Sequence, residues 1–130
     1  MPLYNLACRR PLDPERRRAI ASAITETHCA QTGAPAEYVN VIYFDGYPLR
    51  AGLEIDMVGG VRSDGDRTPE GIERLRVALH DAIARAAGLQ ASQVKVGLVG
   101  VPSSWVMEGG HVMPPPGSEA EKRIDARRKK

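Results

Sequence analysis

The second residue of the chain is a proline, and both its type and its place suit acid–base chemistry. A small second residue normally allows the initiator methionine to be removed, and Pro2 would then carry a free secondary amine. An unperturbed α-amine has a pKa of about 7.7–8.0, and nearby cations or apolar walls disfavour its protonated form. Pro2 is therefore either a proton acceptor that works near neutral pH or a proline that follows the start codon by chance.

The composition indicates one ordinary globular domain. The chain has 130 residues, of which 42% are hydrophobic and 26% charged, which suits a single domain with a modest core. A formal net charge of +2 is too small to indicate a nucleic-acid partner. The sequence has no secretory signal and no apolar stretch long enough to span a bilayer. We expect a cytoplasmic protein with no membrane partner.

Basic runs and cysteines have simple interpretations. The run Arg16–Arg18 falls on a predicted helix and is read as a solvated face, and the run Arg127–Lys130 is read as part of a mobile tail. A phosphate or membrane role for either run is the alternative. Cys8 and Cys29 lack the spacing of metal ligands and are read as small hydrophobic residues of a reducing compartment. A disulfide between them remains open.

The first part of the chain predicts a strand, a helix and a second strand. Alternating residues over Leu3–Cys8 indicate the first strand. Asp13 followed by a proline predicts the start of a helix, because aspartate caps helices well and proline suits the first helical position. Gly33 predicts the end of this helix. The alternation over Tyr38–Phe44 then predicts the second strand.

The same pattern occurs a second time. A strand is predicted over Leu53–Val61, and Thr68-Pro69 repeats the capping residue and the proline. Gly88 predicts the end of the second helix, and the alternation over Val94–Leu98 predicts the fourth strand. The two helix-opening prolines are 55 residues apart, and so are two corresponding valines in the second and fourth strands. Equal offsets at two landmarks indicate an internal repeat.

Two β-α-β units in tandem predict an α/β (α+β) fold. In each unit the crossover makes the two strands parallel and places the helix on one face of the sheet. The expected result is a four-stranded sheet with two helices on one face and a bare apolar face, which self-association would cover. We predict one domain over residues 1–117, with units at about 2–45 and 53–100. Residues 118–130 are predicted to be a polar basic tail that is mobile or lies on a neighbour.

Four segments carry a resemblance to a known family. They are the N-terminal PLY, the stretch AITETH, the segment GGVRSDGDRTPE, and VPSSWVMEGGHVMPPPG near the end. In this order and spacing, from Pro2 to about Gly117, the chain resembles the tautomerase superfamily and in particular its cis-3-chloroacrylic acid dehalogenase group. The resemblance implies a homotrimer that needs no cofactor and no metal, with a small carboxylate as substrate.

The resemblance also implies a set of site residues. The first is Pro2, which matches the catalytic proline of the family. The others fall on a histidine near the substrate carboxylate, two carboxylate-binding arginines and an acid that helps to activate water; they are His28, Arg62, Arg67 and Glu108. The second arginine is placed by aligning the helix start, because this loop is two residues longer. Each of these four residues also has a simpler interpretation, His28 as a helix-end residue and Arg62, Arg67 and Glu108 as solvated loop residues.

These five residues could catalyse either of two reactions. A neutral Pro2 would take a proton from the carbon next to a ketone, while two arginines hold the carboxylate and stabilise the enolate. That reaction is the keto–enol tautomerisation of a 2-oxo acid. A protonated Pro2 would instead donate a proton to an unsaturated acid while Glu108 activates water, which gives a hydratase or a hydrolytic dehalogenase.

One departure from the family decides between these outcomes. The group's dehalogenase has a tyrosine that assists the water, and the aligned residue here is Gly97. We therefore favour tautomerisation of a phenylpyruvate-like 2-oxo acid over hydration or dehalogenation. A non-catalytic trimeric binding protein is a further alternative, and so is an interaction module that uses the basic tail. Retention of Met1 would favour the binding protein, because an amide nitrogen is not basic.

Overall fold

The structure, a computed structural model, describes residues 2–128. Met1, Lys129 and Lys130 lie outside the described residues, so the predicted removal of Met1 and the end of the basic run are not seen. The helices and strands, in chain order, are β1 (Leu3–Cys8), α1 (Pro14–Thr32), η1 (Ala36–Tyr38), β2 (Asn40–Phe44), β3 (Ile55–Arg62), α2 (Pro69–Ala87), η2 (Ala91–Gln93), β4 (Val94–Val101), η3 (Ser103–Trp105), β5 (Met107–Glu108), β6 (His111–Val112) and α3 (Glu119–Arg128).

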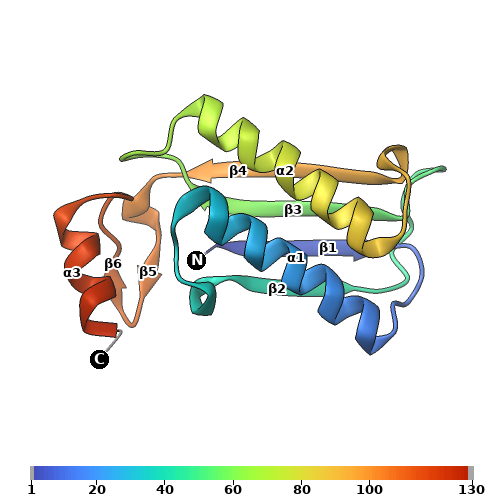
Figure 1. Cartoon of the computed structure of the whole chain (residues 1–130), viewed down its shortest axis with the longest axis horizontal. Helices are drawn as coiled ribbons and strands as arrows, with labels where there is room; N and C mark the ends of the chain where they lie inside the picture. Colours follow the sequence, from blue (N-terminus) through green and yellow to red (C-terminus); the bar gives the residue numbers. More distant parts are fainter. Residues whose placement is uncertain (1, 129–130) are drawn as a thin grey trace.

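The main sheet has the predicted β-α-β units. Its strand order is β2-β1-β3-β4, with β1 parallel to β2, β3 parallel to β4, and β1 antiparallel to β3. Helices α1 and α2 lie side by side over one face of this sheet (Figure 1). The predicted α+β fold with two helices on one face is confirmed.

The helix ends follow the predicted signals. The side chains of Asp13 and Thr68 each accept a hydrogen bond from a backbone N–H three residues later, at 2.7 and 3.0 Å. Both helices begin on the proline after this cap and end at Gly33 and Gly88, which have φ angles of 75° and 67°. Only a residue without a side chain adopts such angles at low cost. The strand predicted from Tyr38 starts later, because a 3₁₀ turn precedes it.

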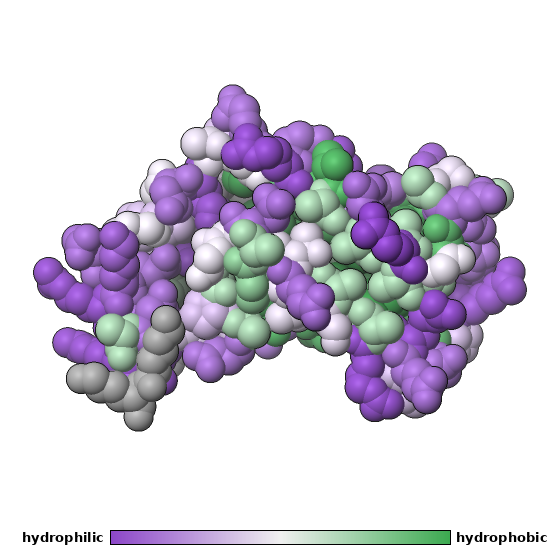
Figure 2. Space-filling view, in the orientation of Figure 1, coloured by the Kyte–Doolittle hydropathy of each residue, from purple (hydrophilic) through white to green (hydrophobic). Residues whose placement is uncertain are grey.

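The sheet separates a buried face from an exposed one. Large apolar side chains point from the strands toward the helices, and the fully buried ones include Tyr4, Leu6, Ile55 and Met57. The opposite face carries large hydrophobic residues that are 39–54% exposed, namely Leu3, Ile42, Phe44, Val58 and Val99. The helix-bearing face in Figure 2 is hydrophilic at both ends and has an apolar band across its middle. The exposed hydrophobic residues on the other face of the sheet form the bare apolar face that was expected.

The end of the chain differs from the prediction. Pro114–Gly117 lies outside helices and strands, as expected. The segment after it was expected to be mobile or to lie on a neighbour, and this expectation is wrong for Glu119–Arg128, which forms helix α3 against its own chain. Acids in its first turn and arginines in its last turn suit the helix dipole. The Ser118 hydroxyl caps it by accepting from the Glu121 N–H at 3.2 Å.

The C-terminal part of the fold lies at one end of the sheet. The β5–β6 hairpin and α3 stand beside the end at which β1 begins (Figure 1). The start of β1 and the C-terminal segments therefore share one end of the sheet. Within residues 2–128, no helix has the length and apolar character needed to cross a membrane.

Candidate active site

Pro2 lies buried at the start of β1. Its carbonyl oxygen accepts a hydrogen bond from the Asn40 N–H at 3.2 Å, which ties the beginning of the chain to β2. Pro2 lines a small cavity of about 10 Å³ together with His28 from the last turns of α1, Arg62 at the end of β3 and Arg67 from the following loop. Residues far apart in the sequence thus meet where the first strand starts.

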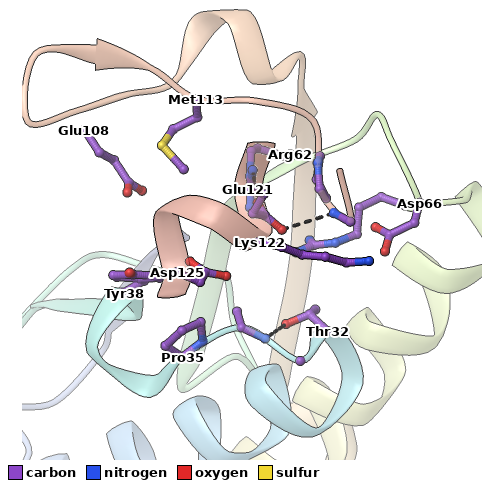
Figure 3. A pocket seen from close by; sticks show the side chains of 15 residues that line it. Thr32, Pro35, Tyr38, Arg62, Asp66, Glu108, Met113, Glu121, Lys122 and Asp125 are labelled. Atoms are coloured by element: carbon purple, nitrogen blue, oxygen red, sulfur yellow. Dashed lines mark hydrogen bonds and ion pairs between the residues drawn. The ribbon is translucent and has the colours of Figure 1, made fainter. Parts of the chain in front are cut away.

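Glu108 joins the same region from β5. It lines a cavity of about 180 Å³ that Arg62 also lines (Figure 3), and Arg67 borders the same cavity. It also lines an open cavity of about 450 Å³ with Pro2. Every site residue predicted from the sequence therefore borders a cavity that Pro2 or the two arginines border.

The two arginines have different surroundings. Arg62 is only 8% exposed, and its Nη1 donates to the Pro114 carbonyl at 2.8 Å and forms an ion pair with Glu121 at 2.5 Å. Arg67 is half-buried and has no ion-pair partner within residues 2–128. Burial lowers the pKa of Arg67, and the charge of Arg62 lowers it further. Two guanidinium groups that border one cavity can together bind a carboxylate.

The loop that carries Arg67 is held against the segment that leads to Glu108. The Ser103 hydroxyl donates to Asp64 at 2.6 Å, and this hydrogen bond lowers the pKa of the Asp64 carboxyl. Gly65 has a φ of 64°, and a Cβ there would lie only 2.3 Å from the Pro116 carbonyl oxygen. That oxygen accepts from the Asp66 N–H at 3.1 Å. The close approach of these segments therefore requires a glycine.

His28 is a neutral, fully buried ring. It is 1% exposed, and its Nδ1 lies 2.6 Å from the Tyr4 hydroxyl oxygen. Burial lowers the pKa of His28 to about 3, with further lowering by Arg67 and Arg62. A neutral imidazole cannot offset a helix dipole, so the simpler interpretation as a charged helix-end residue fails. Its Nε2 has no hydrogen-bond partner within the described residues.

Glu108 is an ionised carboxylate. Its Oε2 accepts a hydrogen bond from Arg128 Nη1 at 2.9 Å. Burial would raise the pKa of this carboxyl, but the hydrogen bond and the charge of Arg128 contribute to holding it below its usual range. An ionised carboxylate is a proton acceptor, which suits a group that activates water. No cluster of three or more histidines, cysteines or acids within residues 2–128 has a geometry that would hold a metal ion.

Gly97 lies outside the site, whereas Trp105, Glu121 and Arg128 lie near it without having been assigned to it from the sequence. Gly97 lies in β4 opposite Val58, with open space beside its Cα, and borders neither cavity that contains Pro2. Trp105 is 74% exposed and lines the larger of these cavities. Glu121 and Arg128 were not predicted, because a polar tail gives no indication of the partners that its side chains meet.

Comparison with known proteins links the chain to solved structures. No family model and no curated protein sequence matches it. The crystal structure of N1, a member of the cis-3-chloroacrylic acid dehalogenase family, matches with a TM-score of 0.81 and 28% identity over 94% of this chain and 90% of N1. The structure of native Ps01740 matches with a TM-score of 0.70 and 30% identity over 82% of this chain and 99% of that one.

A third match shows the fold alone. A fused 4-OT, whose solved structure is an asymmetric trimer, has a TM-score of 0.73 and 18% identity over 85% of this chain and 94% of its own. All three similarities cover most of both chains, so they concern the whole fold rather than one segment.

Proposed function

Because the chain belongs to the tautomerase superfamily and is similar to its cis-3-chloroacrylic acid dehalogenase group, we propose that it is a cofactor-independent enzyme that interconverts the keto and enol forms of a 2-oxo acid. One observation carries the proposal. Pro2, which would hold a basic secondary amine once Met1 is removed, shares cavities with His28, both arginines and Glu108. The family likeness supplies the reaction class, and the cavities supply a place for the substrate.

The arrangement suits proton transfer at the carbon next to a ketone. The neutral Pro2 nitrogen accepts a proton from that carbon, and the electron pair of the C–H bond moves to the ketone oxygen. Arg62 and Arg67 hold the substrate carboxylate and stabilise the enolate charge as it forms. The charged Pro2 then releases this proton, which is transferred to the enolate oxygen and completes the enol. In the reverse direction Pro2 accepts the hydroxyl proton of the enol and delivers it to the carbon, which gives the ketone.

The larger cavity suggests the substrate class. It has a volume of about 450 Å³, and its apolar wall is formed by Leu3, Val101, Trp105, Val106 and Met107. An apolar wall next to a positively charged pocket fits a molecule with a carboxylate at one end and a ring at the other. This supports a phenylpyruvate-like 2-oxo acid.

We also propose that the protein is a homotrimer. Large hydrophobic residues lie exposed on the sheet face away from the helices, and such a face is normally covered. Self-association is the simplest cover. The solved structure of a fused 4-OT with the same fold is a trimer, which supports three copies rather than two.

Water addition to an unsaturated acid is the second candidate. The ionised Glu108, which borders the same cavity as Pro2, favours it. Glu108→Gln would remove the proton acceptor for water and leave Pro2 and the arginines in place. We expect this variant to ketonise enol-phenylpyruvate at nearly the wild-type rate and to lose hydration of cis-3-chloroacrylate by about a hundredfold or more.

The two activities are followed by ultraviolet absorbance and by product analysis on the same samples. Glu26→Gln is the matched control, because Glu26 is exposed in α1 and borders none of these cavities. An equal loss of both activities in Glu108→Gln would contradict the separate role of this carboxylate.

A further inference from the structure

Tyr4 and His28 form a closed hydrogen-bonded pair inside the protein. The Tyr4 side chain is 0% exposed, and its hydroxyl oxygen lies 2.6 Å from Nδ1 of His28. Burial raises the pKa of Tyr4 above its usual range, so the hydroxyl keeps its proton. The imidazole is neutral and carries one proton. If the hydroxyl donates to Nδ1, both groups are satisfied and the ring proton resides on Nε2.

The contact between Tyr4 and Nδ1 leaves the other ring nitrogen of His28, Nε2, available to bind a ligand. It is buried and has no hydrogen-bond partner within residues 2–128. The ring borders the small cavity that also contains Pro2, Arg62 and Arg67. A buried N–H without a partner is costly unless a ligand accepts from it.

We propose that Tyr4 is a positioning residue that holds His28 in the Nε2–H tautomer, so that His28 donates a hydrogen bond to an anionic oxygen of the substrate in the Pro2 cavity. The identity of that substrate rests on the proposed function, but the tautomer does not. The neutral ring adds a directed donor beside two arginines without adding a third positive charge.

The surroundings hold the tyrosine ring in this place. Gly59 pairs with Tyr4 across β1 and β3, and a Cβ on Gly59 would lie 2.5 Å from the tyrosine ring. The Tyr4 ring therefore packs directly against the backbone of Gly59. It meets the histidine ring edge to face, with the ring centres 5.7 Å apart and the planes at 72°. These contacts fix the hydroxyl on the Nδ1 side.

The substitution Tyr4→Phe tests the pairing, since it keeps the ring and removes the hydroxyl. Nitrogen chemical shifts of the His28 ring, measured by long-range proton–nitrogen NMR, report the tautomer directly. We expect the wild type to show a proton on Nε2 and a bare Nδ1, and Tyr4→Phe to lose this preference. With enol-phenylpyruvate, we expect Tyr4→Phe to lower kcat/KM roughly tenfold, as for one lost hydrogen bond in a site.

A second tyrosine provides the control. The Tyr43 hydroxyl donates to the Arg17 carbonyl at 2.6 Å, away from the site, so Tyr43→Phe removes a comparable hydrogen bond. Its His28 signals should match those of the wild type. A wild-type ring protonated on Nδ1, or an unchanged tautomer in Tyr4→Phe, would overturn the inference. Because NMR needs no turnover, a wrong choice of reaction would show as absent activity with the tautomer as predicted.

Helix α3 carries a second, independent inference. Its Glu121 forms an ion pair with Arg62 at 2.5 Å, where the two side chains are 17% and 9% exposed (Figure 3). The other Glu121 oxygen accepts from the Gly117 N–H at 3.1 Å. Glu121 thus already pairs with Arg62, one of the two arginines assigned to the substrate carboxylate.

The far end of α3 makes the complementary contact. Arg128 donates to Glu108 at 2.9 Å, and its guanidinium carbon lies 4.6 Å from the centre of the Tyr38 ring. One end of the helix therefore places an acid on a site arginine, and the other end places an arginine on the site acid. We propose that α3 is a cap whose Glu121 competes with the substrate carboxylate for Arg62, so that the helix must move before substrate binds fully.

We expect ligands with a carboxylate to bind more tightly when Glu121 loses its charge, because Arg62 is then free to bind them. Phenylacetate is a suitable probe, because it has a carboxylate and a ring and does not react. We expect Glu121→Gln to bind phenylacetate about tenfold more tightly than the wild type by calorimetry, which corresponds to about 1.4 kcal/mol. Glu119→Gln is the matched control, since Glu119 is on the same helix, 77% exposed and 3.4 Å from Lys122; its affinity should equal that of the wild type.

A second variant guards against a misfolded helix. Deletion of residues 118–130 removes the cap entirely and should also tighten phenylacetate binding. Equal affinity of the wild type, Glu121→Gln and the deletion variant would overturn the cap. The experiment measures binding alone, so a protein with another reaction at this site would still show the effect. Loss of phenylacetate binding in all variants would overturn the cap together with the carboxylate site.

Discussion

The Pro2→Ala variant is expected to ketonise enol-phenylpyruvate at least about a hundredfold more slowly than the wild type, the scale of one acid–base group. The ring of proline fixes the direction of its nitrogen, and the residue is buried beside Arg62 and Arg67. Alanine replaces the secondary amine with a primary one that lacks this restraint and the packing of the ring. The rate is followed by ultraviolet absorbance at saturating substrate, so that kcat is compared rather than binding.

Two controls separate chemistry from folding in this experiment. Phenylacetate affinity should change little in Pro2→Ala, because the arginines remain. Pro11→Ala changes a proline that borders a separate cavity with Arg10 and Arg16, and its turnover should match that of the wild type. Unchanged turnover in Pro2→Ala would rule out the proline as the acid–base group.

The Arg62→Ala variant should mainly lose affinity for carboxylate substrates. A hydrogen bond to a charged group contributes about 1.5–3 kcal/mol, so a loss of roughly tenfold to hundredfold in kcat/KM is expected. The methyl ester of the same 2-oxo acid has no charge for the guanidinium to bind, and its weaker reaction should change much less. The ratio of the two kcat/KM values is therefore the measurement.

Because Arg62 also holds Glu121, its removal leaves that carboxylate without its ion-pair partner. The double variant Arg62→Ala with Glu121→Gln removes both charges and should show the same preference for the ester. Arg85→Ala, an exposed arginine in the last turn of α2, is the control. An equal loss for acid and ester in Arg62→Ala would place its role elsewhere in the reaction.

The fold was predictable because its signals are local. Asp13 and Thr68 directly precede their helices and accept hydrogen bonds from N–H groups three residues later, and Gly33 and Gly88 end the helices with left-handed backbone. Such features depend only on neighbours in the chain. Each crossover makes its two strands parallel, but the antiparallel pairing of β1 with β3, which joins the two units, was not predicted. The 3₁₀ turn before β2 was missed, since a single turn of this kind has no marked periodicity.

The site was predictable only in part. The family likeness indicated which residues to consider, and the structure brings Pro2, His28, Arg62, Arg67 and Glu108 to one end of the sheet. The roles of these residues remain proposals that the variants above test.

Helix α3 could not be predicted from the sequence. Its polar composition and its position after three prolines resemble those of a mobile tail. What holds it are contacts with distant residues, between Glu121 and Arg62 and between Arg128 and Glu108. The pairing of Tyr4 with His28 also had no sequence signal, because the two residues are 24 positions apart. Long-range polar pairs leave no local pattern.

The most direct test of the central claim is an intact-mass measurement of the purified protein, followed by ultraviolet monitoring of enol-phenylpyruvate ketonisation on the same sample. A free Pro2 amine requires that Met1 be absent, and a basic amine near the arginines should give fast ketonisation. We predict a mass that lacks Met1 together with fast turnover. A protein that retains Met1 and still ketonises at full rate would contradict the account, because an amide nitrogen cannot accept the proton.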